Sequence, residues 1–94
     1  MSSRIDLFKD TLHCCELALK KNPHMFPLQM AIDQINYLIE IQEGFLTDLS
    51  FLNKINIGWV AARELDGFSD IDLINKLHLI SAEVKKIKEE NGYA

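Results

Sequence analysis

Apolar residues recur at intervals of three and four along almost the whole chain, which is the spacing of one face of an α-helix. No stretch alternates apolar and polar residues long enough to predict a β-strand. We therefore predict an all-α protein, a compact bundle of four helices whose short links make most neighbours antiparallel. A chain of 94 residues is expected to form one domain, residues 1–94.

The first two predicted helices have clear boundaries. The first begins after Ser2 or Ser3, whose hydroxyl can cap it, and Asn22-Pro23 stops it. The second begins near Pro27, which suits a first turn, and ends at Gly44. The apolar face is Ile5, Phe8, Leu12, Cys15 and Leu19 in the first helix, and Leu28, Ala31, Ile35, Leu38 and Ile39 in the second.

The third and fourth predicted helices are separated by the turn Asp66-Gly67-Phe68. Thr47 or Asp48 is expected to cap the third, and Ser69 the fourth. Gly58 lies inside the third pattern at a cost of about 1 kcal/mol relative to alanine, which indicates a kink or a close approach of another backbone. The apolar face is Leu49, Leu52, Ile55, Trp59 and Ala62 in the third helix, and Leu73, Leu77, Ile80, Val84 and Ile87 in the fourth.

Charge narrows the range of partners. The net charge of −4 and the pI near 5.2 do not suit a phosphate backbone, so we predict no nucleic-acid partner. From Asp33 to Asp72, two basic residues stand against eight acidic ones, a local charge of −6 that leaves +2 elsewhere. This separation is typical of either an ordinary solvated face or a surface that attracts a basic protein.

Candidate catalytic and metal-ligating residues do not form a site. His13, Cys14 and Cys15 are contiguous, so their side chains point about 100° apart on a helix and cannot share one metal ion or pair a nucleophile with its base. The four glycines are isolated, which excludes a phosphate-cradling loop. We predict no catalytic residue, no metal and no cofactor, and hence no enzyme.

The distribution of charged residues also bears on location. Charged residues interrupt the only apolar stretch near the start, and no apolar run reaches the length of a membrane span. We expect a cytoplasmic protein with reduced thiols and no membrane contact.

Trp59 is the only tryptophan, and two interpretations of it stay open. It either fills the core or anchors a partner, because tryptophan and arginine are enriched among residues that dominate interface energetics. Arg63 follows it by four residues and can stack on it or pair with Asp66.

An ordered set of residues between 34 and 77 carries a family resemblance. It comprises Gln34-x-x-Tyr37-Leu38, Asp48-x-Ser50-x-Leu52, Gly58-x-x-Ala61-x-Arg63-Glu64-Leu65-Asp66, and Asp70 or Asp72 followed by Leu73 and Leu77. The set resembles the small all-helical immunity proteins that neutralise NAD(P) glycohydrolase effector toxins of bacterial type VI secretion, a system of interbacterial competition. The chain departs from the pattern at Leu49, where a basic residue is expected, and at His78-Leu79-Ile80, which lacks aromatic character.

The resemblance implies an antitoxin that binds one cognate, NAD-consuming toxin domain and occludes its NAD-binding site. The residues it assigns to partner binding are Asp48, Glu64, Asp66 and Asp70 as electrostatic contacts, Tyr37 and Trp59 as apolar anchors, and Arg63 as a contact or a support for Glu64 and Asp66. Alternatives are immunity to an ADP-ribosyltransferase-type toxin, or a helical adaptor or dimerisation module that pairs through the stripe of the fourth helix. A homodimer of the free protein is a further hypothesis.

Overall fold

The computed structural model describes residues 3–44, 48–65 and 70–92, and within these ranges the chain is helical and contains no strand. The all-α, four-helix prediction is confirmed. The elements are α1 (Arg4–Lys21), α2 (Phe26–Gln42), the 3₁₀ turn η1 (Ser50–Lys54), α3 (Ile57–Trp59), the π-helical turn η2 (Val60–Glu64) and α4 (Ile71–Glu90).

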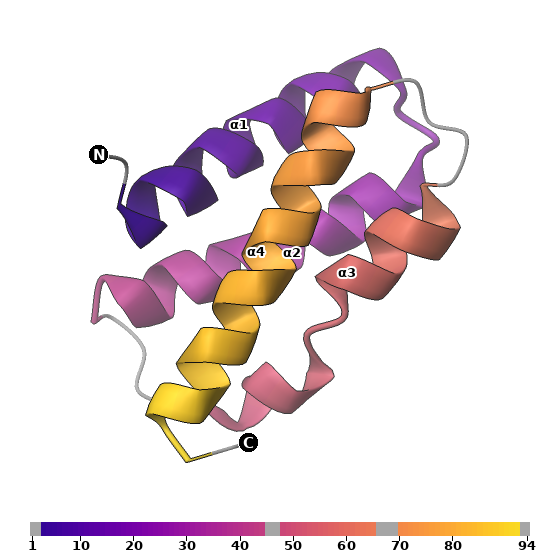
Figure 1. Ribbon diagram of the computed structural model, residues 1–94. Coiled ribbons are helices and arrows are strands. Elements are labelled where there is room, and N and C mark those ends of the chain that lie inside the picture. The colour runs from indigo at the N-terminus through magenta and orange to yellow at the C-terminus, as the bar shows by residue number, and fades with distance from the viewer. Residues whose placement is uncertain (1–2, 45–47, 66–69, 93–94) are drawn as a thin grey trace.

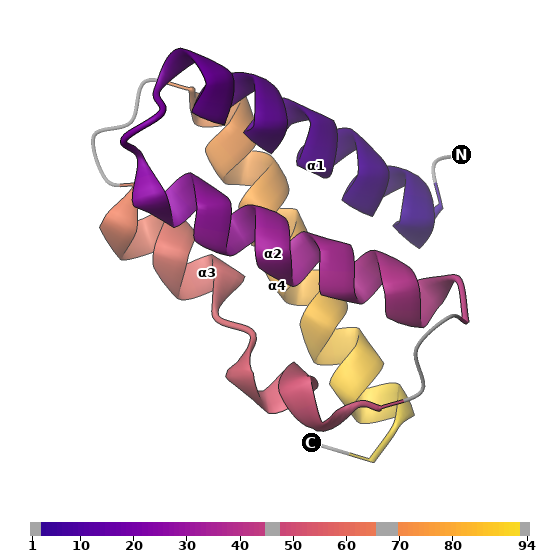
Figure 2. The same ribbon diagram turned by 180° about the vertical axis from the view of Figure 1, so that it is seen from behind.

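The helices α1 and α2 pack against each other and run antiparallel, and α4 crosses them (Figure 1). The view from behind places α1 and α2 in front of α4 (Figure 2). The helix α3 and the turn η2 lie beside α4 and contact it. Buried side chains from all four helices meet in one hydrophobic cluster.

The ends of α1 and α2 confirm the predicted boundaries. The Ser3 hydroxyl accepts a hydrogen bond from the Asp6 backbone N–H at 3.2 Å, and the Ser3 N–H donates to the Asp6 carboxylate at 3.3 Å, which together form a capping box. Asn22 ends α1 by donating its side-chain amide to the Ala18 carbonyl oxygen at 3.0 Å. Gly44 follows α2 with φ +82°, a conformation that glycine adopts without strain.

The predicted core faces are confirmed most fully in α4. All five residues of its predicted stripe are buried. In α1 and α2 most of the predicted face is buried, with the remainder at its edges. The half-buried edge residues are Ile5, Leu12, Leu19 and Ile39, and the buried residues that the pattern missed are Thr11, Ala18, Ile32 and Gln34.

The third predicted helix is wrong as a continuous element. Ile55 and Asn56 are not helical, so η1 and α3 are separate, and α3 then widens into the π-helical turn. The break at Ile55 and Asn56 changes which of the following residues face the core. Trp59 is 51% exposed and Ala62 is also exposed, whereas the buried residues are Leu52, Ile57, Val60, Ala61 and Leu65.

Gly58 marks a close approach of α4, and the approaching atoms belong to a side chain. A Cβ atom added at Gly58 would lie 2.6 Å from Ser81 Oγ and 3.2 Å from Ser81 Cβ. Glycine therefore lets α3 pack against α4 at this crossing.

The cap of α4 also differs from the prediction. Asp70 is the N-cap, and its carboxylate accepts a hydrogen bond from the Leu73 N–H at 3.0 Å. Ser69, the predicted cap, lies outside the described residues, as does Thr47. Asp48, the other residue predicted to cap the third helix, accepts a hydrogen bond from the Ser50 N–H at 3.0 Å.

Candidate functional site

Residues 48–65, hereafter the 48–65 segment, present an apolar face inward and a mixed face outward. The segment follows α4 along one side of the molecule (Figure 1). Its inward residues belong to the hydrophobic cluster. Its exposed residues include Phe51, which is 37% exposed, together with Trp59, Arg63 and Glu64.

Gln34 of α2 holds the middle of the 48–65 segment through a pair of hydrogen bonds. Its side-chain Nε2 donates to Asn56 Oδ1 at 2.6 Å, and its Oε1 accepts from the Asn56 backbone N–H at 3.0 Å. Asn56 lies between η1 and α3, where a backbone N–H has no helical partner. The Gln34 amide therefore supplies the hydrogen bond that the interrupted helix lacks.

Tyr37, one turn after Gln34 on α2, holds the start of the segment. Its hydroxyl donates to the Asp48 carbonyl oxygen at 2.7 Å. Its ring meets that of Phe51 edge to face, with centroids 4.9 Å apart and planes at 71°. Tyr37 was predicted as an anchor for the partner; the structure shows it half-buried and binding the segment, and a direct partner contact stays a prediction.

The predicted carboxylates are not gathered in one cluster. Asp48 precedes η1, which lies near the C-terminal end of α4 in Figure 1, whereas Asp70 caps the N-terminal end of α4. Glu64 is exposed in η2, close in sequence to Trp59 and Arg63. Asp66, together with its predicted pairing to Arg63, lies outside the described residues.

Three of these carboxylates, Asp48, Glu64 and Asp70, form no ion pair with another described residue. The ion pairs in the described part of the chain join α1 to α4, α1 to the residue after α2, and two neighbours within α4. The Ser50 N–H holds the pKa of the Asp48 carboxyl below its usual range. Asp48 therefore stays ionised at neutral pH and presents a full negative charge.

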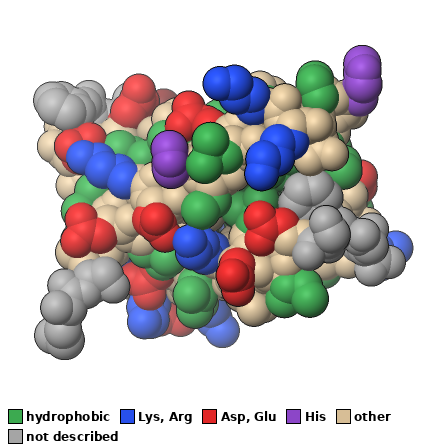
Figure 3. Space-filling model, turned by 90° about the horizontal axis from the view of Figure 1, so that it is seen from above, with side chains coloured by type: hydrophobic (Ala, Val, Ile, Leu, Met, Phe, Trp, Pro, Cys, Tyr) green, Lys and Arg blue, Asp and Glu red, His purple; other side chains and the backbone are tan. Residues whose placement is uncertain are grey.

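Other surfaces are mixed in charge. On the face seen in Figure 3, acidic and basic side chains are interspersed with hydrophobic ones.

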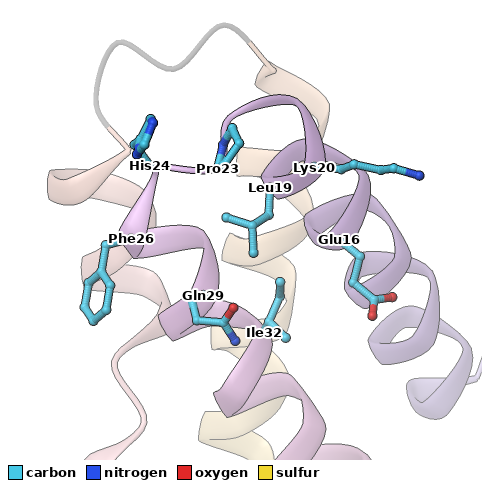
Figure 4. Close-up of a pocket in the computed structure, with 8 residues that line it drawn as sticks. All are labelled: Glu16, Leu19, Lys20, Pro23, His24, Phe26, Gln29 and Ile32. Atoms are coloured by element: carbon cyan, nitrogen blue, oxygen red, sulfur yellow. The ribbon is translucent and has the colours of Figure 1, made fainter.

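A groove of about 720 Å³ lies between the end of α1 and the start of α2, and Figure 4 shows Leu19 and Ile32 between the two helices. Its polar lining residues include Glu16 and Lys20, and none of the predicted partner-binding residues lines it. Phe26 beside it is 70% exposed, which sequence analysis did not predict.

The described residues hold no group of three side chains that could bind a metal ion, and no helix among them is long and apolar enough to cross a membrane. Cys15 is buried, and burial raises the pKa of its thiol to about 12. Cys14 is half-buried and accepts a hydrogen bond from Lys76 Nζ at 3.3 Å. The two neighbouring thiols therefore have different surroundings.

Gln34 is the residue whose role sequence analysis missed. A polar side chain three residues after Ala31 and four before Leu38 lies on the apolar face of α2, and that spacing is the signal that could have identified it. Its partner is 22 residues away, and sequence periodicity does not encode that contact.

One comparison with known proteins gives a match. The Tsi6 family model matches residues 3–86, which is most of the chain. No curated protein and no solved structure matches.

Proposed function

Because the chain belongs to the Tsi6 family of type VI secretion immunity proteins, we propose that it binds one cognate effector toxin in the cytoplasm and covers that toxin's NAD-binding site. The family match over residues 3–86 is the observation that carries the proposal. The family is not an enzyme family, and we infer that protection comes from binding rather than from turnover.

The outward face of the 48–65 segment is the surface we assign to the toxin. It presents Trp59 at 51% exposure with Arg63 four residues later, and both residue types are enriched among those that dominate interface energetics. The inward face of the segment is fixed by the core, and α2 holds it through Gln34 and Tyr37. A surface held in this way loses little conformational freedom on binding, which favours affinity.

The carboxylates on and beside this surface suit a toxin that consumes NAD. Such a toxin binds a pyrophosphate, and pyrophosphate sites are lined by basic side chains or by helix N-termini. We assign Glu64 and Asp66 to this cleft because they follow the exposed Trp59 closely in sequence. Asp48 and Asp70 lie farther off and would contact its rim, where they steer encounter with a basic protein.

The test is co-expression of candidate toxins with this protein, scored by bacterial survival and by cellular NAD. The expected result is survival with NAD preserved, and loss of protection in Glu64→Lys. Glu40→Lys is the matched control because Glu40 is an exposed helical glutamate on α2, outside the assigned surface. If both variants protect equally well, Glu64 is not a toxin contact. If the protein protects against a toxin that leaves NAD intact, the NAD-site assignment is wrong while family membership stands.

Of the two alternative functions, one predicts the same binding surface and the other does not agree with the burial of α4. Immunity to an ADP-ribosyltransferase-type toxin predicts the same surface and is separated from the first proposal only by the toxin's product. A dimerisation module that pairs through Leu73, Leu77, Ile80 and Val84 of α4 is not favoured, because these residues are buried in the core of one chain. A homodimer of the free protein would need another surface.

A further inference from the structure

We propose that Gln34 is a positioning residue for partner binding. Through Asn56 it sets the spacing between the turn that carries Phe51 and the helix that carries Trp59, and it does so without contacting the partner. The inference rests on the proposed function, because it assumes that the outward face of the 48–65 segment is the binding surface.

Because Gln34 is buried, its side chain does not contact the partner directly. Its side chain lies in the apolar face of α2 and is 7% exposed, among neighbours that are fully buried. An amide in such a place is costly unless it is hydrogen-bonded, and an apolar residue of similar volume would fill the space at least as well. Core stability therefore does not explain why this position holds an amide, and the two bonds to Asn56 do.

Asn56 transmits the constraint to the exposed surface. Its carbonyl oxygen accepts the Val60 N–H at 2.9 Å, which is the first helical bond of α3. Preceding it, Ile55 is extended, with φ −68° and ψ 124°, so η1 cannot set the direction of α3 by continuing as a helix. The bonds from Gln34 fix the residue from which α3 starts, and Trp59 lies three residues farther along.

The other contacts of the segment do not replace this one. Tyr37 binds the carbonyl of Asp48 at its start, and Gly58 packs against Ser81 beyond the break. Between η1 and α3, the Ile55 N–H donates to the Leu52 carbonyl oxygen at 3.3 Å, a bond that stays within the segment. The paired hydrogen bonds from Gln34 join Asn56 to α2.

The experiment compares Gln34→Leu with two variants that retain part or all of the link. Leucine removes both bonds at similar volume. Gln34→Glu is the rescue variant, because its carboxylate accepts from the Asn56 N–H and, after the Asn56 amide rotates, from that side chain as well. Asn56→Ala, on an exposed residue, keeps the backbone bond and removes the other, so it serves if leucine prevents folding. Gln29→Leu is the matched control, because Gln29 is an exposed α2 glutamine whose bond goes to Asp33.

Two readouts separate the inference from the proposed function. Hydrogen exchange of the free protein needs no partner, and we expect Gln34→Leu to speed exchange of the Asn56 and Val60 amides about tenfold while the α4 amides stay unchanged. The second readout is binding to a toxin against which the protein protects in the survival test, used in a catalytically inactive form. We expect about tenfold faster dissociation for Gln34→Leu, and a rate close to that of the wild type for Gln34→Glu.

Each result decides one of the two claims. Unchanged exchange in Gln34→Leu overturns the positioning role, whatever the partner does. Faster exchange with unchanged binding also overturns it, provided that Trp59→Ala weakens binding. If Trp59→Ala and Gln34→Leu both bind like the wild type, the outward face is not the toxin surface, and the proposed function loses its site. Intermediate effects of Asn56→Ala, between wild type and Gln34→Leu, support the inference.

Discussion

Replacing Gly58 with alanine should destabilise the protein, although alanine is the better helix former. The added methyl group would lie 2.6 Å from Ser81 Oγ and 3.2 Å from Ser81 Cβ. The hydroxyl can rotate away, but the Cβ atom moves only if α4 shifts. Overpacking of this kind costs about 1–3 kcal/mol, and the helix propensity of alanine returns at most about 1 kcal/mol.

Taking the middle of that cost and the full return, we expect Gly58→Ala to lower the free energy of unfolding by about 1 kcal/mol. For a domain of this size that corresponds to a fall in melting temperature of about 4–8 °C. Urea unfolding followed by circular dichroism measures the free energy. Fluorescence of Trp59, the residue next to Gly58, reports the same transition from the site of the change.

A double-mutant cycle tests the cause. Ser81→Gly removes both atoms that the new methyl group would meet, and the cycle cancels its own helix-propensity cost. The two substitutions should couple by at least about 0.5 kcal/mol, so that Gly58→Ala is tolerated better in the Ser81→Gly background. If Gly58→Ala is as stable as the wild type, or if the two changes are additive, the contact with Ser81 does not explain the glycine.

Three further predictions concern α1 and α4. Arg4 pairs with Glu83 at 2.9 Å and with Glu90 of α4 at 2.9 Å, and it lowers the pKa of both carboxyls. These ion pairs therefore stabilise the folded protein above the usual glutamate pKa near 4.5, and the stabilisation is lost as the pH falls below that value. Arg4→Met should therefore flatten the decline of the urea midpoint between pH 5 and 3, and an unchanged decline would contradict this. Thr11 is buried and its hydroxyl bonds to no described residue, so Thr11→Val should raise the free energy of unfolding by about 1 kcal/mol in the same urea assay, and a loss would mean that the hydroxyl is bonded. Asp70→Asn keeps a capping side chain and removes the charge, so it should leave stability within about 0.5 kcal/mol and slow association with the toxin, whereas a large stability loss would show that the charge matters to the helix.

Where an element is fixed by local interactions, the sequence predicts it well. The stripe of α4 is buried at all five predicted positions because its 3.6-residue period continues without interruption for five turns. The start of α1 follows from Ser3 and Asp6, three residues apart. Such contacts lie within one helical turn, so spacing alone reveals them.

The third element was mispredicted because a distant residue determines it. Its apolar spacing suits a continuous helix, but Gln34 binds Asn56 and stabilises a break that local propensity does not favour. The break turns Trp59 outward, so Trp59 does not fill the core, and its role as a partner anchor stays a prediction. For α4, the sequence predicts a side-chain cap at its start but not which of two adjacent residues supplies it, because Ser69 and Asp70 can both cap a helix.

The division of the 48–65 segment into inward and outward residues has a consequence for evolution and for engineering. Leu52 and Ile57 are committed to folding, whereas Trp59, Arg63 and Glu64 have little part in the core. On the toxin surface that we propose, outward positions can therefore diversify while the scaffold persists, and discrimination between rival toxins can change through a few exchanges that favour one opponent and repel another. A library randomised at these three positions and selected for survival would sample new specificities on an unaltered framework.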